Sequence, residues 1–257
     1  MIFTVRLADL NIEIHSIYPE LQHFFKDYLV ENVTADLSVS WTEEEISAEK
    51  DRASNENYPM EYLETLAALR KISELLPLRK RLLVHGAAIT YDDKAYLFTA
   101  QSGTGKSTHI CLWKEYLGSR VDIVNGDKPF VSLENVDCKD AANVATSDGS
   151  TRVCAKVYGT PWAGKESWEK NRSAELNGIC FLQRGKENKI RRLEPSECLD
   201  YLFNQVYLPK DPVALSMTLE LADLLTKNVP LYLLECDISE EAVKCSFEGM
   251  TGMEYRE

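Results

Sequence analysis

The sequence predicts a mixed α/β protein in which a small N-terminal α+β region precedes a larger α/β core. Two observations predict this class. Short apolar runs typical of strands alternate with stretches of helical spacing along the whole chain of 257 residues. The pattern also changes near Pro77, where a leucine-rich helical stripe ends and a strand-like run begins. We therefore expect an α+β region over residues 1–76 and the core over residues 77–257.

The N-terminal region contains patterns of both kinds. Alternation of apolar and polar residues over 2–15 predicts one or two half-buried strands, and residues 35–41 predict another. Helical spacing marks residues 20–29 and, with its leucine stripe, residues 60–77, which we expect to be a core helix. The polar, acidic stretch 42–59 is expected to be a solvated connector, its carboxylates at 43–45 forming an exposed face.

The core opens with a predicted hairpin. Residues 81–100 consist of two apolar runs on either side of an Asp-Asp-Lys turn. A helix is expected after the second run, with Gly118 as its C-terminal cap, and the strand after it is expected to end at a turn that contains Asp127. Later strands are expected over 178–183 and 229–236, and helices over 195–208, 211–227 and 238–250.

The bulk composition argues against several classes of function. A formal charge of −12 and a pI of about 4.9 disfavour non-specific binding to nucleic acid or to anionic membranes. No apolar run approaches the ~20 residues of a membrane span, and the N-terminus lacks the pattern of a signal peptide. The seven cysteines form no Cys-x-x-Cys pair, so we expect reduced, mostly buried thiols and a cytoplasmic protein.

Residues 99–113, "TAQSGTGKSTHICLW", have the features of a phosphate-binding loop. A strand, a run of small residues, a lysine and a helix N-terminus follow one another in the order that such a loop requires. Ala100 stands where the usual pattern begins with glycine, and alanine can adopt the conformation needed there, with φ below zero. The residues expected to hold a nucleotide are Ala100, Ser102, Gly103, Thr104, Gly105, Lys106, Ser107 and Thr108.

Each of these residues has an expected task. Backbone amides from Gly103 to Thr108 would surround the β-phosphate, at the positive end of the helix dipole. Lys106 would bridge the β- and γ-phosphates, and the Ser107 hydroxyl would bind Mg²⁺. The alternative is a Gly/Ser turn that only matches the motif.

Two residues that flank the loop indicate what could be done with the nucleotide. His85 lies 15 residues before Ala100 (100 − 85), in the strand expected to pair with the one that feeds the loop. Asp127 lies 21 residues after Lys106 (127 − 106), at the expected end of the next strand. A carboxylate at a strand end beside a phosphate loop is suited to hold a metal ion or to act as a general base.

Taken together, residues 81–133 resemble the core of the HPr kinase/phosphorylase and phosphoenolpyruvate carboxykinase superfamily. A His-Gly strand, a Ser-Gly-x-Gly-Lys-Ser loop and an acidic strand end occur here in the same order and at similar spacing. The resemblance implies the fold of that P-loop core and places His85 beside the metal and the transferred phosphate. The sequence departs from both families at Gly126, where they have the first of two aspartates, so Asp127 would act as metal ligand, base or both.

The segment 157–168, "VYGTPWAGKESW", is the second unusual stretch. It is similar to a segment of small bacterial proteins described as HPr-kinase-like or carboxykinase-like. One interpretation is a loop that contacts substrate through Trp162 and Lys165; the other is a tight turn with Trp162 packed in the core. Lys128 and Arg152 are further candidates for a substrate anion, with a solvated surface cation as the alternative for Lys128. His109 is expected to be a packing or supporting residue.

The resemblance and the flanking residues together predict an ATP- and Mg²⁺-dependent kinase, with Mn²⁺ as an alternative metal. Its catalytic residues would be Asp127, His85 and Lys106, and its metal ligands Ser107, Asp127 and His85. The acceptor would be a serine of a small protein or peptide, or a small-molecule alcohol. A nucleotide-dependent switch without phosphotransfer is the alternative, and carboxykinase chemistry is less favoured because those enzymes are much longer chains. We expect no nucleic acid or membrane partner. The sequence does not distinguish ATP from GTP or pyrophosphate as the phosphate donor, and it does not distinguish a monomer from a homo-oligomer.

Overall fold

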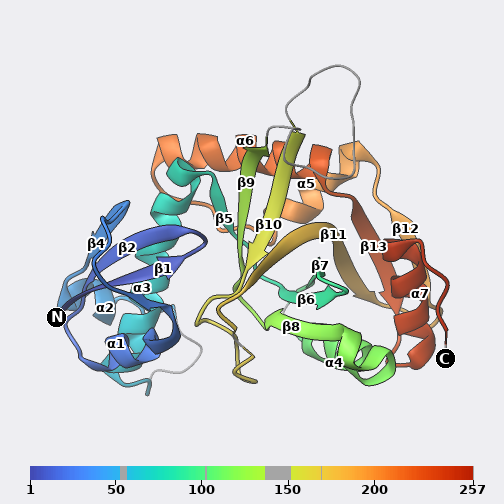
Figure 1. Ribbon diagram of the computed structural model, residues 1–257, viewed down its shortest axis with the longest axis horizontal. Coiled ribbons are helices and arrows are strands. Elements are labelled where there is room, and N and C mark those ends of the chain that lie inside the picture. Colours follow the sequence, from blue (N-terminus) through green and yellow to red (C-terminus); the bar gives the residue numbers. More distant parts are fainter. Residues whose placement is uncertain (53–56, 102, 137–151, 169, 257) are drawn as a thin grey trace.

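A computed structural model describes the chain except residues 53–56, 102, 137–151, 169 and 257, and gives only the backbone of residues 135, 136 and 152. Its described part contains a four-stranded and a nine-stranded sheet, which lie at opposite sides of the view in Figure 1. Helices cover both sheets, so the predicted mixed α/β class is confirmed. No helix in the described ranges is long and apolar enough to cross a membrane.

The small sheet is built from the first forty residues, in the order β3-β1-β2-β4. β1 and β2 form an antiparallel hairpin whose inward side chains, such as Val5 and Ile12, are fully buried. Helix α3 packs against β4 and α2 and covers this sheet. The elements are β1 (Ile2–Leu7), β2 (Leu10–His15), α1 (Glu20–Phe24), β3 (Leu29–Val30), β4 (Leu37–Ser40), α2 (Glu43–Ser47) and α3 (Met60–Leu75).

The large sheet has the order β5-β9-β10-β11-β7-β6-β8, and β13 and β12 continue from β11. β11 runs parallel to both β7 and β13, which places the ends of these three strands at one edge. The strands are β5 (Arg81–Leu83), β6 (Ala87–Tyr91), β7 (Lys94–Thr99), β8 (Val121–Asn125), β9 (Phe130–Val136), β10 (Arg152–Tyr158), β11 (Ser173–Arg184), β12 (Lys189–Arg192) and β13 (Leu231–Cys236).

Helices cover the large sheet in two pairs. Helices α4 and α7 contact each other and the strands from β6 to β8 and β12 to β13, whereas α5 and α6 contact each other and α6 also contacts β5, β9 and β10. Figure 1 shows the pairs in different layers, with α6 above the strands and α4 below them. Their bounds are α4 (Lys106–Leu117), α5 (Pro195–Phe203), α6 (Pro212–Asn228) and α7 (Glu240–Thr251).

The expected elements are present, with one difference in a strand. The predicted strand that starts at residue 81 is broken at His85–Gly86, so that β5 pairs with β9 while β6 pairs with β7. Gly118 caps α4 as expected. Of the six described cysteines only Cys180 and Cys198 are buried, so the expectation of mostly buried thiols is wrong; Cys138 lies outside the described residues.

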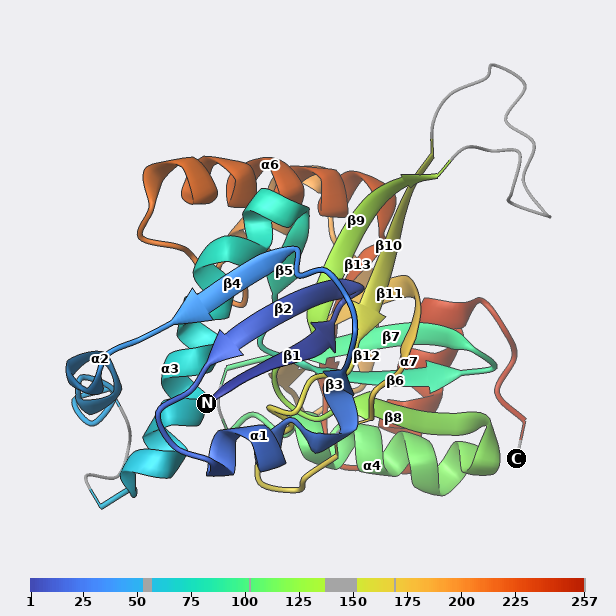
Figure 2. The ribbon, with the colours of Figure 1, turned by 60° about the vertical axis from the view of Figure 1, so that its left-hand side comes forward.

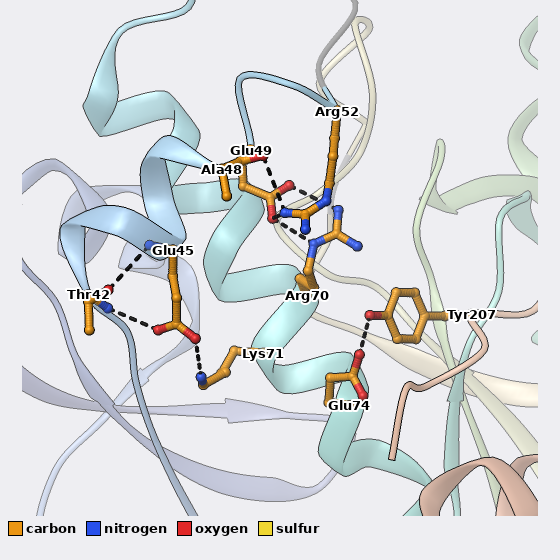
Figure 3. A network of polar contacts seen from close by, with 9 residues as sticks. All are labelled: Thr42, Glu45, Ala48, Glu49, Arg52, Arg70, Lys71, Glu74 and Tyr207. Atoms are coloured by element: carbon orange, nitrogen blue, oxygen red, sulfur yellow. Dashed lines mark hydrogen bonds and ion pairs between the residues drawn. The ribbon is translucent and has the colours of Figure 1, made fainter. Parts of the chain in front are cut away.

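The expected solvated connector over 42–59 is also wrong in part. Residues 43–47 form α2, and Glu49 beyond it is buried, with its carboxylate bound by Arg52 and by both the Nε and Nη2 atoms of Arg70 (Figure 3). Hydrogen bonds from two guanidinium groups offset the free-energy cost of burying one carboxylate. This network joins α2 to α3.

A shared apolar core joins the two sheets. Trp162 lies within ring-contact distance of Phe24 and Phe25 from the N-terminal region and of Phe130 from β9. Its indole Nε1 donates a hydrogen bond of 2.9 Å to the Thr65 carbonyl of α3. The small sheet is therefore packed against the strands that carry the candidate site (Figure 2).

Candidate functional site

The glycine-rich loop connects β7 to α4. β7 ends at the buried Thr99, and Ala100 after it is only 4% exposed. Gly103 and Gly105 have φ values of +77° and +121°, which favour glycine at both positions. Helix α4 begins at Lys106 with no side-chain cap, so the first amides of the helix are available to an anion. Ser102, one of the expected nucleotide contacts, lies outside the described residues.

Lys106 points back across this loop. Its Nζ donates a hydrogen bond of 3.1 Å to the Ala100 carbonyl and lies 3.2 Å from Nε2 of His85. Burial lowers the pKa of Lys106, the nearby charge of Asp127 opposes this effect, and Lys128 adds to it. An anion at the loop would relieve the cost of keeping this ammonium charged.

His85 lies between β5 and β6 rather than inside a strand, which corrects the sequence prediction. Gly86 has no room for a side chain, because a Cβ there would lie 2.9 Å from the Phe98 carbonyl oxygen. The backbone N–H of His85 donates to the Gln205 carbonyl, at 2.7 Å, and that of Gly86 donates to the Asp127 carbonyl, at 2.9 Å. The break in the strand thus fixes the imidazole between Lys106 and Asp127.

Asp127 is the centre of the charged cluster. Its Oδ1 lies 3.3 Å from Nε2 of His85, and its Oδ2 lies 3.2 Å from Nζ of Lys128. Burial by itself raises the pKa of Asp127, but the hydrogen bond with His85 and the charge of Lys128 outweigh it and leave the pKa below its ordinary value. The carboxylate is therefore ionised at neutral pH.

Asn125 positions this carboxylate and was not recognised from the sequence. Its side chain is fully buried at the end of β8, and its Oδ1 accepts hydrogen bonds from the backbone N–H groups of Asp127 and Lys128, at 2.9 and 2.8 Å. Its Nδ2 donates to the Thr160 carbonyl. The Asn-Gly-Asp triplet could have indicated this role, because an asparagine side chain in a turn often accepts a hydrogen bond from the backbone N–H two residues later.

The segment 157–168 lies next to Asp127 through its backbone. Gly164, with φ +82°, approaches so closely that a Cβ on it would lie 3.2 Å from Cβ of Asp127. Trp162 is 7% exposed and belongs to the shared core, so the structure favours the packing interpretation for it. Lys165 is exposed to solvent.

Arg152 is not brought to the site. Its backbone pairs with Val136, at the far end of β9 from the Asp127 turn, whereas Phe130 at the near end pairs with Tyr158. Six residues of strand separate the two ends by roughly 20 Å. The side chain of Arg152 lies outside the described part of the chain.

Arg184 is a second residue that the sequence did not single out. It ends β11, and its guanidinium donates to the Gly103 carbonyl at 2.6 Å. Cavities of about 390 and 470 Å³ lie beside the loop, and Arg184 lines both. The larger one includes the half-buried Leu112 and the buried Leu182, which suits an apolar ring system. The sequence feature that could have indicated Arg184 is a cation at the end of β11, the strand that runs parallel to β7 and so ends on the same side as the loop.

The donor set suits a magnesium ion that arrives with a nucleotide. No group of three His, Cys, Asp or Glu side chains in the described ranges could hold a metal by itself. Mg²⁺ in nucleotide sites takes one or two protein oxygens, and phosphate oxygens and waters complete its shell. The Asp127 carboxylate and the Ser107 hydroxyl, in the first turn of α4, are oxygen donors of this kind.

Comparison with known proteins finds likenesses among solved structures. No protein-family model and no curated protein matches the chain. The structure is similar to the solved "Hpr(Ser) kinase/phosphatase from Coxiella burnetii", with 12% sequence identity and a TM-score of 0.28; the match covers 63% of this chain and 89% of that chain. A likeness at this level carries no argument about activity.

Proposed function

We propose that this protein is an ATP- and Mg²⁺-dependent phosphotransferase that transfers the γ-phosphate to a hydroxyl group. The observation that supports it is the convergence of Lys106, His85 and Asp127 at the mouth of a loop with the geometry of an anion site. These residues come from three separate segments, the start of α4, the break between β5 and β6, and the turn after β8, and His85 contacts both of the others.

The side chains divide the work between binding and proton transfer. The loop amides and the N-terminus of α4 hold the β-phosphate, and Lys106 moves from the Ala100 carbonyl to the β- and γ-phosphates. A Mg²⁺ ion held by Ser107 and Asp127 would supply neutralisation of the phosphate oxygens. Asp127 accepts the proton of the acceptor hydroxyl as it attacks, and His85 beside it fixes the carboxylate and can take a place in the metal shell.

The proposal is tested with γ-labelled ATP and Mg²⁺ and a panel of small alcohols, peptides and proteins. We expect label transfer by the wild type and a loss of roughly 10²-fold or more for Asp127→Asn, which keeps the shape but not the base. Nucleotide affinity is measured in parallel. Transfer at the wild-type rate by Asp127→Asn would show that this carboxylate has neither role.

A nucleotide-binding switch is the second candidate function. The supporting observation is that Asp127 is already paired with Lys128 and that the preceding residue, Gly126, has no room for a second carboxylate. Binding of ATP that is never followed by transfer or hydrolysis, in wild type and Asp127→Asn alike, would favour the switch. Release of labelled phosphate or a labelled acceptor would exclude it.

A further inference from the structure

A cavity of about 260 Å³ lies between α3 and strand β5 of the large sheet. Its apolar wall consists of Leu66 and Leu69 from α3 and Leu83 from β5. The volume lies just below the usual range for small-molecule sites. The cavity therefore suits a small molecule better than a loop of a folded protein.

Lys128 connects this cavity to the catalytic cluster. Its side chain lines the cavity, and its Nζ lies 3.2 Å from Oδ2 of Asp127. Lys106 lies at the phosphate loop and is not part of the cavity lining. Asp127 is thus linked through His85 to a loop that suits a nucleotide, and through Lys128 to a cavity of a different character.

Helix α3 presents one face to this region. Tyr62, Leu66, Leu69 and Arg70 follow the spacing of a single helix face. Burial raises the pKa of Tyr62, and Tyr58 and the negative charge of Asp127 raise it further, which places this phenol within electrostatic reach of the carboxylate. The leucines at 66 and 69, expected to be core, are half-buried: they pack against the shared apolar core and also line the cavity.

The charges around the cavity favour an anion. Arg52, Arg70 and Lys128 line it together with a single carboxylate, that of Glu49. The Glu49 side chain is 3% exposed, whereas the side chains of Arg52 and Arg70 are 41% and 35% exposed. The buried Glu49 carboxylate therefore pairs with both arginines, while their side chains stay partly exposed to solvent. With three cations and one carboxylate, the cavity lining has an excess of positive charge, although the chain as a whole is acidic.

We propose that this cavity binds the phosphate acceptor, and that the acceptor is a small hydroxy acid with a short aliphatic body. Its carboxylate meets the arginines, its aliphatic part lies on the leucines, and its hydroxyl reaches Asp127 beside Lys128. A guanidinium pair suits a planar carboxylate, and buried leucine surface suits a methylene chain. The inference rests on the phosphotransferase activity proposed above.

The reaction balances with the groups already named. The hydroxyl oxygen of the hydroxy acid forms a bond to the γ-phosphorus while the bond from that phosphorus to the β–γ bridging oxygen breaks. Asp127 takes the hydroxyl proton, and ADP leaves with the electron pair of the broken bond. The products are ADP and a phosphorylated hydroxy acid, and no oxidant or reductant is needed.

Binding and transfer are tested separately, so that failure of the site and failure of the proposed activity can be told apart. Short aliphatic hydroxy acids and their neutral methyl esters are added to the full chain, and the thermal transition is followed without nucleotide. We expect the acids, and not the esters, to raise the transition midpoint. The same compounds are then offered as acceptors with γ-labelled ATP, next to a serine peptide.

Two variants and one control report on the cavity. Arg52→Gln removes a lining cation, and Leu66→Phe fills the apolar wall; each is expected to raise the KM for the hydroxy acid roughly ten-fold or more, with ATP affinity unchanged. Lys71→Gln is the control. Lys71 is a cation of α3 that pairs with Glu45 and does not line this cavity. The KM of this control variant should equal that of the wild type.

Equal binding of acids and esters, or equal KM values in Arg52→Gln and Lys71→Gln, would overturn the inference. Label on the serine peptide but on no hydroxy acid would also overturn it, while leaving the phosphotransferase in place. Carboxylate-specific binding without transfer to any acceptor would instead contradict the phosphotransferase, and with it the acceptor role of the cavity.

Discussion

At the scale of single residues, Gly126 explains why the acidic turn has only one aspartate. A Cβ at this position would lie 2.5 Å from the backbone oxygen of Ala163, closer than real Cβ contacts come. The space that a second carboxylate would need is filled by the segment that anchors Trp162. The absence of the second aspartate is therefore a consequence of packing, and Asp127 is the one aspartate of this turn.

Replacement of this glycine should destabilise the protein. Gly126→Asp is expected to lower the free energy of unfolding by about 1–3 kcal/mol through the clash with Ala163, without increasing turnover. Urea denaturation measures the loss, and Gly126→Ala, which adds the Cβ without the charge, should show a similar loss. A stable Gly126→Asp variant with raised activity would show that the turn can move.

Lys106 is the residue on which the proposed nucleotide binding should depend most directly. Its ammonium group lies at the loop and next to His85, so Lys106→Ala removes the charge that the phosphates would meet. We expect ATP binding or turnover to fall by roughly 10²-fold or more. Lys114→Ala, an exposed lysine on the same helix, is the control. Unchanged kinetics in Lys106→Ala would refute the assignment of the loop.

At the scale of elements, α4 is held against α7 by a buried polar contact. Ser246 donates to the Val243 carbonyl and accepts from Nε1 of Trp113, at 2.9 and 2.8 Å, and Nε2 of His109 lies 3.1 Å from the same hydroxyl. The hydroxyl proton is used, so His109 must carry its own proton on Nε2. Of the two roles expected for His109, packing is the one that this geometry supports.

This contact predicts a pH dependence of stability. Burial lowers the pKa of His109 to about 4, from 6.5. Between these values the unfolded chain binds a proton that the folded chain does not, so stability falls as the pH drops from 6.5 to 4, by up to roughly 3 kcal/mol. Unfolding free energies of wild type and His109→Gln, measured across this range, should converge or cross toward low pH. Parallel curves would contradict the assignment.

At the scale of the whole molecule, the N-terminal region is one wall of the site. Trp162 joins α3 to the large sheet, and α3 supplies Leu66, Leu69 and Arg70 to the cavity that Lys128 also lines. The division at residues 76 and 77 stays a prediction, because the two parts share one apolar core.

Loss of the shared tryptophan should weaken the whole fold. Trp162→Ala is expected to cost about 3–5 kcal/mol of unfolding free energy, the usual effect of removing a buried aromatic side chain. Trp162→Phe keeps much of the ring contact and loses the hydrogen bond to Thr65, so its cost should be smaller. Chemical denaturation measures both. A near-neutral Trp162→Ala variant would show that the two regions are not coupled through this residue.

The sequence was most informative where function depends on neighbouring residues along the chain. The strand, glycines, lysine and helix of the phosphate loop are consecutive, and the β6–β7 hairpin could be predicted from its turn. His85 was found by its spacing, although it lies in a break between strands. Asn125 and Arg184 were missed because their partners are backbone groups whose positions depend on the folded sheet.

The sequence by itself determined the mixed α/β class, the loop, and the two residues that flank it, because local patterns and short-range order are sufficient for these. Only the tertiary structure decided that Lys106, His85 and Asp127 meet, that Trp162 is a core residue, and that α3 lines a cationic cavity beside Asp127. These facts depend on contacts between residues far apart in the chain. Such contacts arise from packing of the two sheets, which no short stretch of sequence specifies.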